Sequence, residues 1–294
     1  MTSSETLREV DSYYREAYLD YVLVWRTFEH LSMHFGYHDT ESLPRRWLRF
    51  RHAIDNVNRV LADRADVGEG DRVLDAGCGV GGSVIWLSRH RGADAVGLNV
   101  TQEHLRKGRK RADGDADGTA EFVAGDFTRT GFADETFDVV WAVEAVCHAE
   151  DTLEFTEEAY RVLRPGGRLV ISDGYLSRPH DEMTEEELRR VEAVKQAWVG
   201  GEVDTVEEFR GHLDDAGFED VEFEDQYERV KPSAVYLWLA SVLAAPGAWV
   251  LESLGLRNER QRRNRVAARH QYPLLRDGTV VHGLFVARKP EGDG

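Results

Sequence analysis

The chain has 294 residues, 41% of them hydrophobic, and a formal net charge of −17 at pH 7. This length predicts one large domain, or one domain that carries an elaborated cap. The acidic balance argues against general nucleic-acid binding, which uses basic surfaces, and no run of 18 apolar residues occurs, so we expect no stable membrane insertion.

Other compositional features indicate the compartment. The first residues, 1–5, lack the basic and apolar segments of a signal peptide. Two cysteines, Cys78 and Cys147, are too few for a disulfide framework and lie in no metal-ligand pattern, so we expect a cytoplasmic protein. The histidines form no metal-like cluster with acids, so we expect no catalytic metal. The 5 lysines against 32 arginines, with many acids, are typical of a halophilic surface, although high-GC coding would produce the same arginine bias.

Residues 1–64 predict an N-terminal helical lid. Aromatic residues recur there at spacings of three and four, which places them on one helix face, either as core or as the wall of a ligand pocket. They are Tyr14, Tyr18, Tyr21, Trp25 and Phe28. The segment 32–38 and Pro44 predict a loop, and an amphipathic helix follows over about 45–64.

From residue 71 to about 173, short apolar runs alternate with amphipathic segments. This order predicts parallel strands joined by right-handed helical crossovers. We expect strands at 72–76, 94–99, 120–123, 137–143 and 167–173, and helices at 83–91, 102–112 and 152–163.

The last third adds a charged helix at 181–199, a helix that starts at the capping box of Thr205 and Glu208, and a strand at 221–223. About 50 residues rich in apolar and aromatic groups precede a final strand at 278–287. The predicted fold is therefore α/β: a Rossmann-like, seven-stranded, mostly parallel sheet with helices on both faces. A core over 65–294 would carry a helical cap inserted at about 225–278.

The glycine-rich turn after the first strand is the main functional signal. Gly77, Gly79 and Gly82 fit the dinucleotide fingerprint G-x-G-x-x-G. NAD-binding folds place an acid about 20 residues later on the ribose, whereas here the second strand ends in Asn99. Asp75 lies beside the turn, where a carboxylate repels a pyrophosphate and attracts a cation. A ligand with an adenosine end and an ammonium end fits better, and S-adenosylmethionine has both.

Two later segments agree with that ligand. Asp126 can accept the adenine amino group and Phe127 can stack on the ring. The motif 161–167 joins a helix to a strand. With these motifs, residues 70–175 resemble the class I S-adenosylmethionine-dependent methyltransferases.

Within that superfamily the details are most similar to sterol and isoprenoid C-methyltransferases and to tocopherol-type methyltransferases. The segments that carry this likeness are 33–37, 97–99, 125–127 and 144–149. Residues 225–278 match no single family firmly, which leaves the methyl acceptor open.

The resemblance implies roles for individual residues. The expected cofactor-binding residues are Tyr21, His34, Asp75, Gly77, Gly79, Asn99, Thr101, Gln102, Asp126, Phe127 and Glu144. The expected substrate-binding residues are Tyr14, Tyr18, Trp25, Tyr236 and Trp238. Glu144 and His148 are the candidate catalytic bases, with the alternatives that Glu144 orients backbone and that His148 is a polar loop residue.

We expect methyl transfer to a small hydrophobic or aromatic substrate, by C-methylation of an isoprenoid, a sterol-like lipid, a quinone or an aromatic ring. The alternatives are O- or N-methylation of a small metabolite and a non-catalytic cofactor-binding protein. Asn99 and the motif 161–167 disfavour an NAD-dependent oxidoreductase. The arginine cluster Arg257–Arg265 is either a solvated face or a site for an anionic substrate group, and a homo-oligomer is compatible with the chain.

Overall fold

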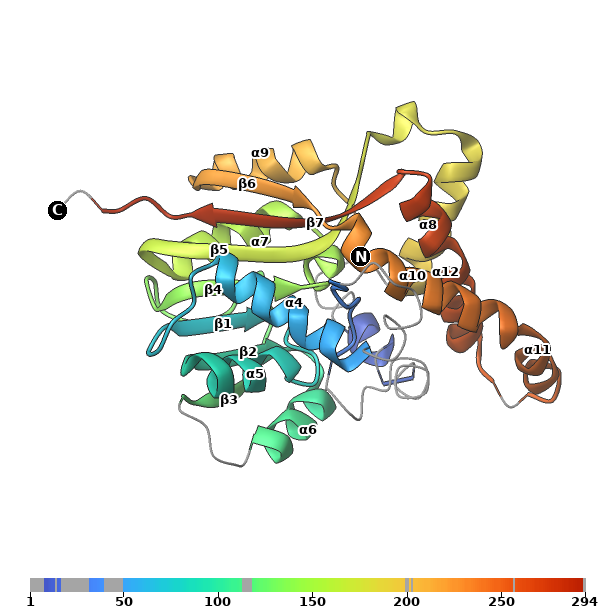
Figure 1. Cartoon of the computed structure of the whole chain (residues 1–294), viewed down its shortest axis with the longest axis horizontal. Helices are drawn as coiled ribbons and strands as arrows, with labels where there is room; N and C mark the ends of the chain where they lie inside the picture. The colour runs from blue at the N-terminus through green and yellow to red at the C-terminus, as the bar shows by residue number, and fades with distance from the viewer. Residues whose placement is uncertain are drawn as a thin grey trace.

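The computed structural model describes residues 8–13, 15–16, 32–39, 50–112, 118–198, 201, 203–255 and 257–292. A central sheet lies between two layers of helices, and helices from late in the chain extend beyond one end of it (Figure 1). The described strands form one seven-stranded sheet in the order β3-β2-β1-β4-β5-β7-β6. The predicted α/β, Rossmann-like sheet is therefore confirmed.

Each predicted strand forms near its expected bounds. The strands are β1 (Arg72–Ala76), β2 (Asp94–Asn99), β3 (Ala120–Ala124), β4 (Phe137–Val143), β5 (Leu163–Leu176), β6 (Glu219–Asp225) and β7 (Val280–Arg288). The first five pair in parallel, and β7 runs antiparallel between β5 and β6. β5 starts earlier than expected because Leu163 already pairs with Phe137, ahead of a register shift.

The helices also follow the expected order. The described helices are α4 (Phe50–Arg64), α5 (Gly82–Arg91), α6 (Gln102–Ala112), α7 (Thr152–Val162), α8 (Glu185–Trp198), α9 (Val206–Ala216), α10 (Tyr227–Leu243), α11 (Ala245–Ser253) and α12 (Glu259–Arg276), with short 3-10 turns η1 (Val146–His148) and η2 (His180–Glu182). The predicted capping box opens α9, because Glu208 N donates to the Thr205 hydroxyl while the Glu208 carboxylate accepts from Thr205 N.

Alternating side chains of the central strands build a core on each face of the sheet. Val73 and Val139 face the layer that contains α4, α5 and α10. Leu74 and Val140, one residue further along each strand, face the layer of α7 and α9. Both faces of β1 and β4 are therefore buried, as their continuous apolar sequences require.

Helices α10, α11 and α12 occupy the chain between β6 and β7, the expected position of the cap, and α12 packs against α8 and α10. Within the described ranges, no single helix is long and apolar enough to cross a membrane; α10 and α11 together reach that length but are bent by 51°. The division at residue 64 between lid and core stays a prediction.

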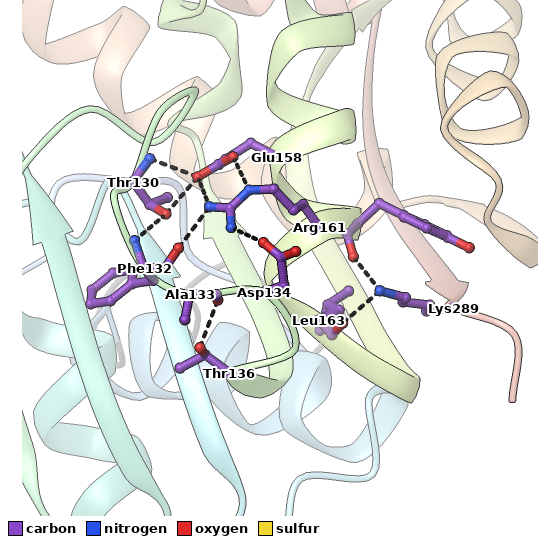
Figure 2. A network of polar contacts seen from close by, with 10 residues as sticks. Thr130, Phe132, Ala133, Asp134, Thr136, Glu158, Arg161, Leu163 and Lys289 are labelled. Atoms are coloured by element: carbon purple, nitrogen blue, oxygen red, sulfur yellow. Dashed lines mark hydrogen bonds and ion pairs between the residues drawn. The ribbon is translucent and has the colours of Figure 1, made fainter. Parts of the chain in front are cut away.

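An arginine in the last turn of α7 secures the loop between β3 and β4 (Figure 2). The Arg161 guanidinium donates to both carboxylate oxygens of Glu158, at 2.7 and 2.8 Å, and pairs with Asp134. The Glu158 carboxylate in turn accepts from the amide and hydroxyl of Thr130 at 2.8 and 2.6 Å. Helix α7 thereby holds the loop 125–136, which explains the arginine of the predicted helix-to-strand motif.

Phe285 of β7 provides a test of the core. Its ring lies 4.8–5.2 Å from the rings of Tyr175, Phe209 and Phe223 and is 1% exposed. We expect Phe285→Ala to lower the free energy of unfolding by about 3–5 kcal/mol, because it removes apolar contacts and leaves a cavity. Urea denaturation measures this, with Trp249→Ala, at an exposed position, as a control that changes stability by no more than about 0.5 kcal/mol. Equal effects of both variants would contradict the packing described.

Candidate functional site

Two cavities lie at the carboxyl ends of the parallel strands, the edge at which open α/β sheets bind ligands. The first cavity, of about 310 Å³, is lined by the turn after β1 and by the ends of β2 and β4. The second cavity, of about 380 Å³, lies between the ends of β4 and β5 and the helices α8, α10 and α12. Met33, Glu144 and His148 line both cavities, so the two spaces adjoin at these residues.

The glycine turn forms the floor of the first cavity. Gly77 and Gly79 have φ values of +86° and +52°, a region that glycine adopts without strain. A Cβ on Gly77 would lie 2.5 Å from the Cβ of Ala145, so a larger residue does not fit there. The amides of Gly77 and Cys78 both donate to Leu98 O, which folds the turn back onto β2.

Asp75 supplies a buried carboxylate at one end of this cavity. Its side chain is 3% exposed, and no described residue donates a hydrogen bond to its carboxylate. Burial raises the pKa of Asp75 to about 8. A buried carboxylate without a partner is costly unless a cation neutralises it, so this end of the cavity fits the ammonium group of S-adenosylmethionine.

The other end of the first cavity offers groups that suit an adenosine. Asn99 donates from Nδ2 to Gly79 O at 3.0 Å, and its Oδ1 accepts from Thr101 N at 3.3 Å. Asp126 accepts through Oδ1 from the amide and hydroxyl of Thr128, which leaves Oδ2 for a ligand amino group. The Phe127 ring is part of the lining. These donors and acceptors fit the expected ligand.

Two of the expected cofactor residues are not in the lining of the first cavity. Thr101 is fully buried and its carbonyl accepts from the amides of His104 and Leu105, which starts α6. Gln102 is exposed on the first turn of that helix. Both residues lie between Val100 and His104, which do line the cavity, and the cofactor-binding role expected for them stays a prediction. Tyr21 lies outside the described residues.

Segment 32–39 crosses from the sheet to the late helices. The amide of Tyr37 donates to Ala53 O in α4 at 2.8 Å, and the amide of Gly36 donates to the Ser233 hydroxyl in α10 at 3.1 Å. His34, on this segment, lines the first cavity, and burial lowers its pKa. Its Nδ1 bonds Phe35 O at 2.8 Å, which makes Nδ1 the protonated nitrogen of the neutral ring.

Glu144 holds this segment against the sheet. Its Oε1 accepts from Phe35 N at 2.8 Å and from His282 Nε2 at 3.1 Å, and its own amide donates to Ser172 O at 2.8 Å. Its φ of +46° is unfavourable for a residue with a side chain. The interactions therefore keep Glu144 in a strained conformation where the two cavities adjoin.

The second cavity is polar at the end shared with the first and largely apolar elsewhere. Asp173 accepts from the amides of Cys147 and Gly174 at 3.1 and 2.8 Å, and burial raises its pKa to about 6. Glu144, His148 and Asp173 occupy the shared end. The remaining wall is mainly aliphatic and includes Leu176, Val191, Val194, Leu237, Leu274 and Leu275.

The aromatic wall expected from α10 is not observed. Leu237, Ala240, Ser241 and Ala244, at i, i+3, i+4 and i+7, face the second cavity. Tyr236 and Trp238 are neighbours of Leu237 in sequence, and each is rotated from it by about 100° around the helix axis. Both are absent from the lining of the second cavity. Trp238 packs instead near Tyr272, with the ring centres 6.0 Å apart. Tyr14, Tyr18 and Trp25 lie outside the described residues.

Several lining residues were not predicted from the sequence. They are Asp173, Trp198 and His282, together with the α12 face that contains Asn264 and Ala268. The available signals were an acid at the end of the β5 apolar run and a histidine inside the otherwise apolar run of β7. Each has an ordinary structural explanation in the sequence, so only their convergence in space marks them as site residues.

The arginine cluster divides into two groups. Among the described lining residues, Arg257 and Arg265 belong to the second cavity, and Arg265 pairs with Glu252 at 2.6 Å. The other three arginines are not part of the lining and form ion pairs with Glu16 or Glu259. Within the described ranges, no group of His, Cys, Asp or Glu side chains is arranged to hold a metal ion.

Comparison with known proteins identifies the same segment as functional. Residues 74–171 match the family model described as "Methyltransferase domain". A methyltransferase of Streptomyces halstedii, GfsG, is 30% identical over 228 residues, which is 77% of this chain and 78% of the relative. The 27-O-demethylrifamycin SV methyltransferase of Amycolatopsis mediterranei is 32% identical over 69% of this chain and 72% of the relative.

A sterol 24-C-methyltransferase of Eremothecium gossypii is 34% identical over 70% of this chain, but the match spans 54% of that relative. Among solved structures, the [4+2]-cyclase SpnF superposes with a TM-score of 0.75 at 22% identity and 97% coverage of both chains. Geranyl diphosphate methyltransferase, in complex with geranyl diphosphate and sinefungin, has a TM-score of 0.72 at 17% identity, covering 97% and 99%. These structural matches show the shared fold.

Asp75→Asn tests the cation site. We expect the dissociation constant for S-adenosylhomocysteine to rise about 10- to 100-fold, because an amide cannot replace the charge that faces the ammonium. Isothermal titration calorimetry measures this. Asp215→Asn, at an exposed carboxylate, is the matched control and is expected to leave the affinity unchanged.

Asp75→Asn should also change how the stability of the protein depends on pH. The folded-state pKa of Asp75, about 8, lies above its ordinary value of 3.8, so the folded protein keeps a proton that the unfolded chain releases. The contribution of this group to the stability of the ligand-free protein is therefore lost as the pH rises from about 4 to about 8. Asp75→Asn should flatten this dependence and unfold at a higher temperature than the wild type at pH 8. An unchanged pH profile in calorimetry would contradict the assignment.

Proposed function

Because the chain belongs to the class I S-adenosylmethionine-dependent methyltransferases, we propose that it methylates a hydrophobic small molecule held in the second cavity. The observation that carries this proposal is the junction of the two cavities at Met33, Glu144 and His148. A donor in the first cavity and an acceptor in the second would meet at these residues.

The first cavity would orient the donor. S-adenosylmethionine supplies an electrophilic methyl group when bound. Asp75, once ionised, attracts the ammonium group, and the bare backbone of Gly77 and Gly79 permits a close approach of the ligand. Segment 32–39 covers the junction through its bond to Glu144. Such positioning and exclusion of water are the main contributions that a protein makes to an in-line methyl transfer.

The second cavity favours C-methylation of an isoprenoid, a sterol-like lipid, a quinone or an aromatic ring. When a carbon–carbon double bond attacks the methyl group, positive charge develops on the acceptor. The carboxylate of Glu144, at the junction, and that of Asp173, in the second cavity, would stabilise that charge. His148 or Asp173 would then accept the proton that the acceptor loses, while the aliphatic wall binds the rest of the molecule. The sterol 24-C-methyltransferase among the relatives supports this choice.

O-methylation is the second candidate. The relative from Amycolatopsis mediterranei, whose name describes a methyltransferase for a 27-O-demethyl compound, is matched over 72% of its length. In that case His148 or Asp173 would take the proton of an acceptor hydroxyl as the methyl group arrives. The same two cavities serve either reaction, and the product distinguishes them.

The function is tested by incubating the protein with isotopically labelled S-adenosylmethionine and a lipid and metabolite extract, followed by mass spectrometry and NMR of the labelled product. We expect a hydrophobic product that carries the label on carbon. A label on oxygen would establish the second candidate, and labelling of polar metabolites alone would overturn the assignment of an apolar acceptor.

A cavity-filling variant tests the acceptor site. Ala240 lines the second cavity, so Ala240→Phe is expected to lower kcat/KM for the labelled acceptor at least about tenfold while changing the affinity for S-adenosylhomocysteine less than about twofold. Glu228→Phe, at an exposed position of α10 outside the lining, is the matched control with unchanged turnover. Steady-state kinetics separate the two variants, and full activity of Ala240→Phe would place the acceptor elsewhere.

A further inference from the structure

The strongly exposed large apolar side chains of the described residues are confined to one region. They are Val242 at 40%, Leu243 at 77%, Trp249 at 68%, Leu251 at 41% and Leu254 at 66% exposure. All lie within 13 consecutive residues, at the end of α10 and along α11 and its exit. A contiguous exposed apolar patch marks an interaction site more often than scattered exposed residues do. We call residues 242–254 the apolar tip.

The apolar tip adjoins the second cavity. α10 contributes Leu237, Ala240, Ser241 and Ala244 to the wall of that cavity, and the last of these falls inside the tip. Figure 1 shows α11 at the end of α10 and α12 that is farthest from the sheet. A molecule that enters along α10 from this end therefore passes the tip before it reaches the cavity.

The tip and the helix that follows it are basic in an acidic chain. Residues 242–270 contain six arginines and two glutamates, a formal charge of +4, whereas the whole chain has −17. The two glutamates, Glu252 and Glu259, are already in ion pairs with Arg265, Arg262 and Arg263. Arginines flanking exposed aromatic and aliphatic groups are typical of segments that lie in the headgroup region of an anionic membrane.

We propose that the apolar tip docks on an anionic lipid surface and admits the acceptor from that surface into the second cavity. α11 has nine residues, and the bend of 51° between α10 and α11 keeps the pair from forming one straight span. The tip would therefore lie along the surface rather than cross it. A second copy of the chain fits less well, because a two-fold contact would bring two arginine-rich segments together. We call binding to the lipid surface the docking half of this proposal, and passage of the acceptor from that surface into the second cavity the entry half. The docking half does not depend on the proposed function, whereas the entry half rests on the proposed apolar acceptor.

Vesicle co-sedimentation of the full chain tests the docking half. The vesicles are phosphatidylcholine with or without phosphatidylglycerol, and no donor or acceptor is added. We expect binding that requires phosphatidylglycerol and weakens with added salt. Trp249→Ser combined with Leu254→Ser should lower the partition coefficient at least about tenfold, because two apolar side chains no longer enter the interface.

Charge-reversal variants separate electrostatics from apolar contact. Arg262→Glu combined with Arg263→Glu should abolish the preference for phosphatidylglycerol. Arg106→Glu combined with Lys110→Glu, at exposed positions of α6, is the matched control and should bind as the wild type does. Equal binding by all variants would overturn the proposal. So would sedimentation equilibrium that shows a dimer of the wild type converted to a monomer by the tip variants.

The entry half is tested with the acceptor identified by product analysis. The Trp249→Ser, Leu254→Ser variant should retain wild-type turnover when the acceptor is dispersed in detergent, and lose most of it when the acceptor is embedded in vesicles. Equal loss in detergent would overturn entry from the surface. Absence of methyl transfer by the wild type in both forms would instead count against the proposed function and would leave the measured vesicle binding intact.

Discussion

The arrangement of the site depends on the hydrogen bonds that Glu144 makes. Its carboxylate accepts from Phe35 on the segment that reaches α10 and from His282 on β7, while its amide bonds to β5. Glu144 thus connects three parts of the chain that are far apart in sequence, two through its carboxylate and one through its backbone amide. Its φ of +46° is unfavourable, at a cost of about 1–2 kcal/mol. Such strain persists at functional sites where surrounding contacts determine the conformation.

Around this residue the protein buries carboxylates that its own residues do not neutralise. Asp75 has no hydrogen-bond donor among the described residues, and Asp173 is held by two backbone amides without a paired cation. Burial raises the pKa of both. The free energy of desolvation lowers the stability of the ligand-free protein, and a positive charge bound beside either carboxylate would offset this loss.

Local sequence determined the secondary-structure elements and the glycine turn well. The glycine turn, the predicted strands and the capping box at Thr205 each depend on residues within a few positions of one another. The expected site residues and the cavity linings differ where local patterns gave no side-chain orientation. Tyr236 and Trp238 were expected to bind the substrate, but the rotation of α10 turns Leu237, and not these two residues, toward the second cavity. Thr101 and Gln102 lie between Val100 and His104, which line the first cavity, but are themselves absent from its lining.

The sequence by itself determined that this chain forms a Rossmann-like sheet with a methyl-donor site, because the strand, glycine turn and helix that build this site are contiguous. Only the tertiary structure decided the second cavity. Its walls come from α8, α10 and α12, and it brings together Glu144, directly after β4, Asp173 of β5 and His282 of β7. The relative placement of such distant segments depends on packing across the whole fold, which no local pattern encodes.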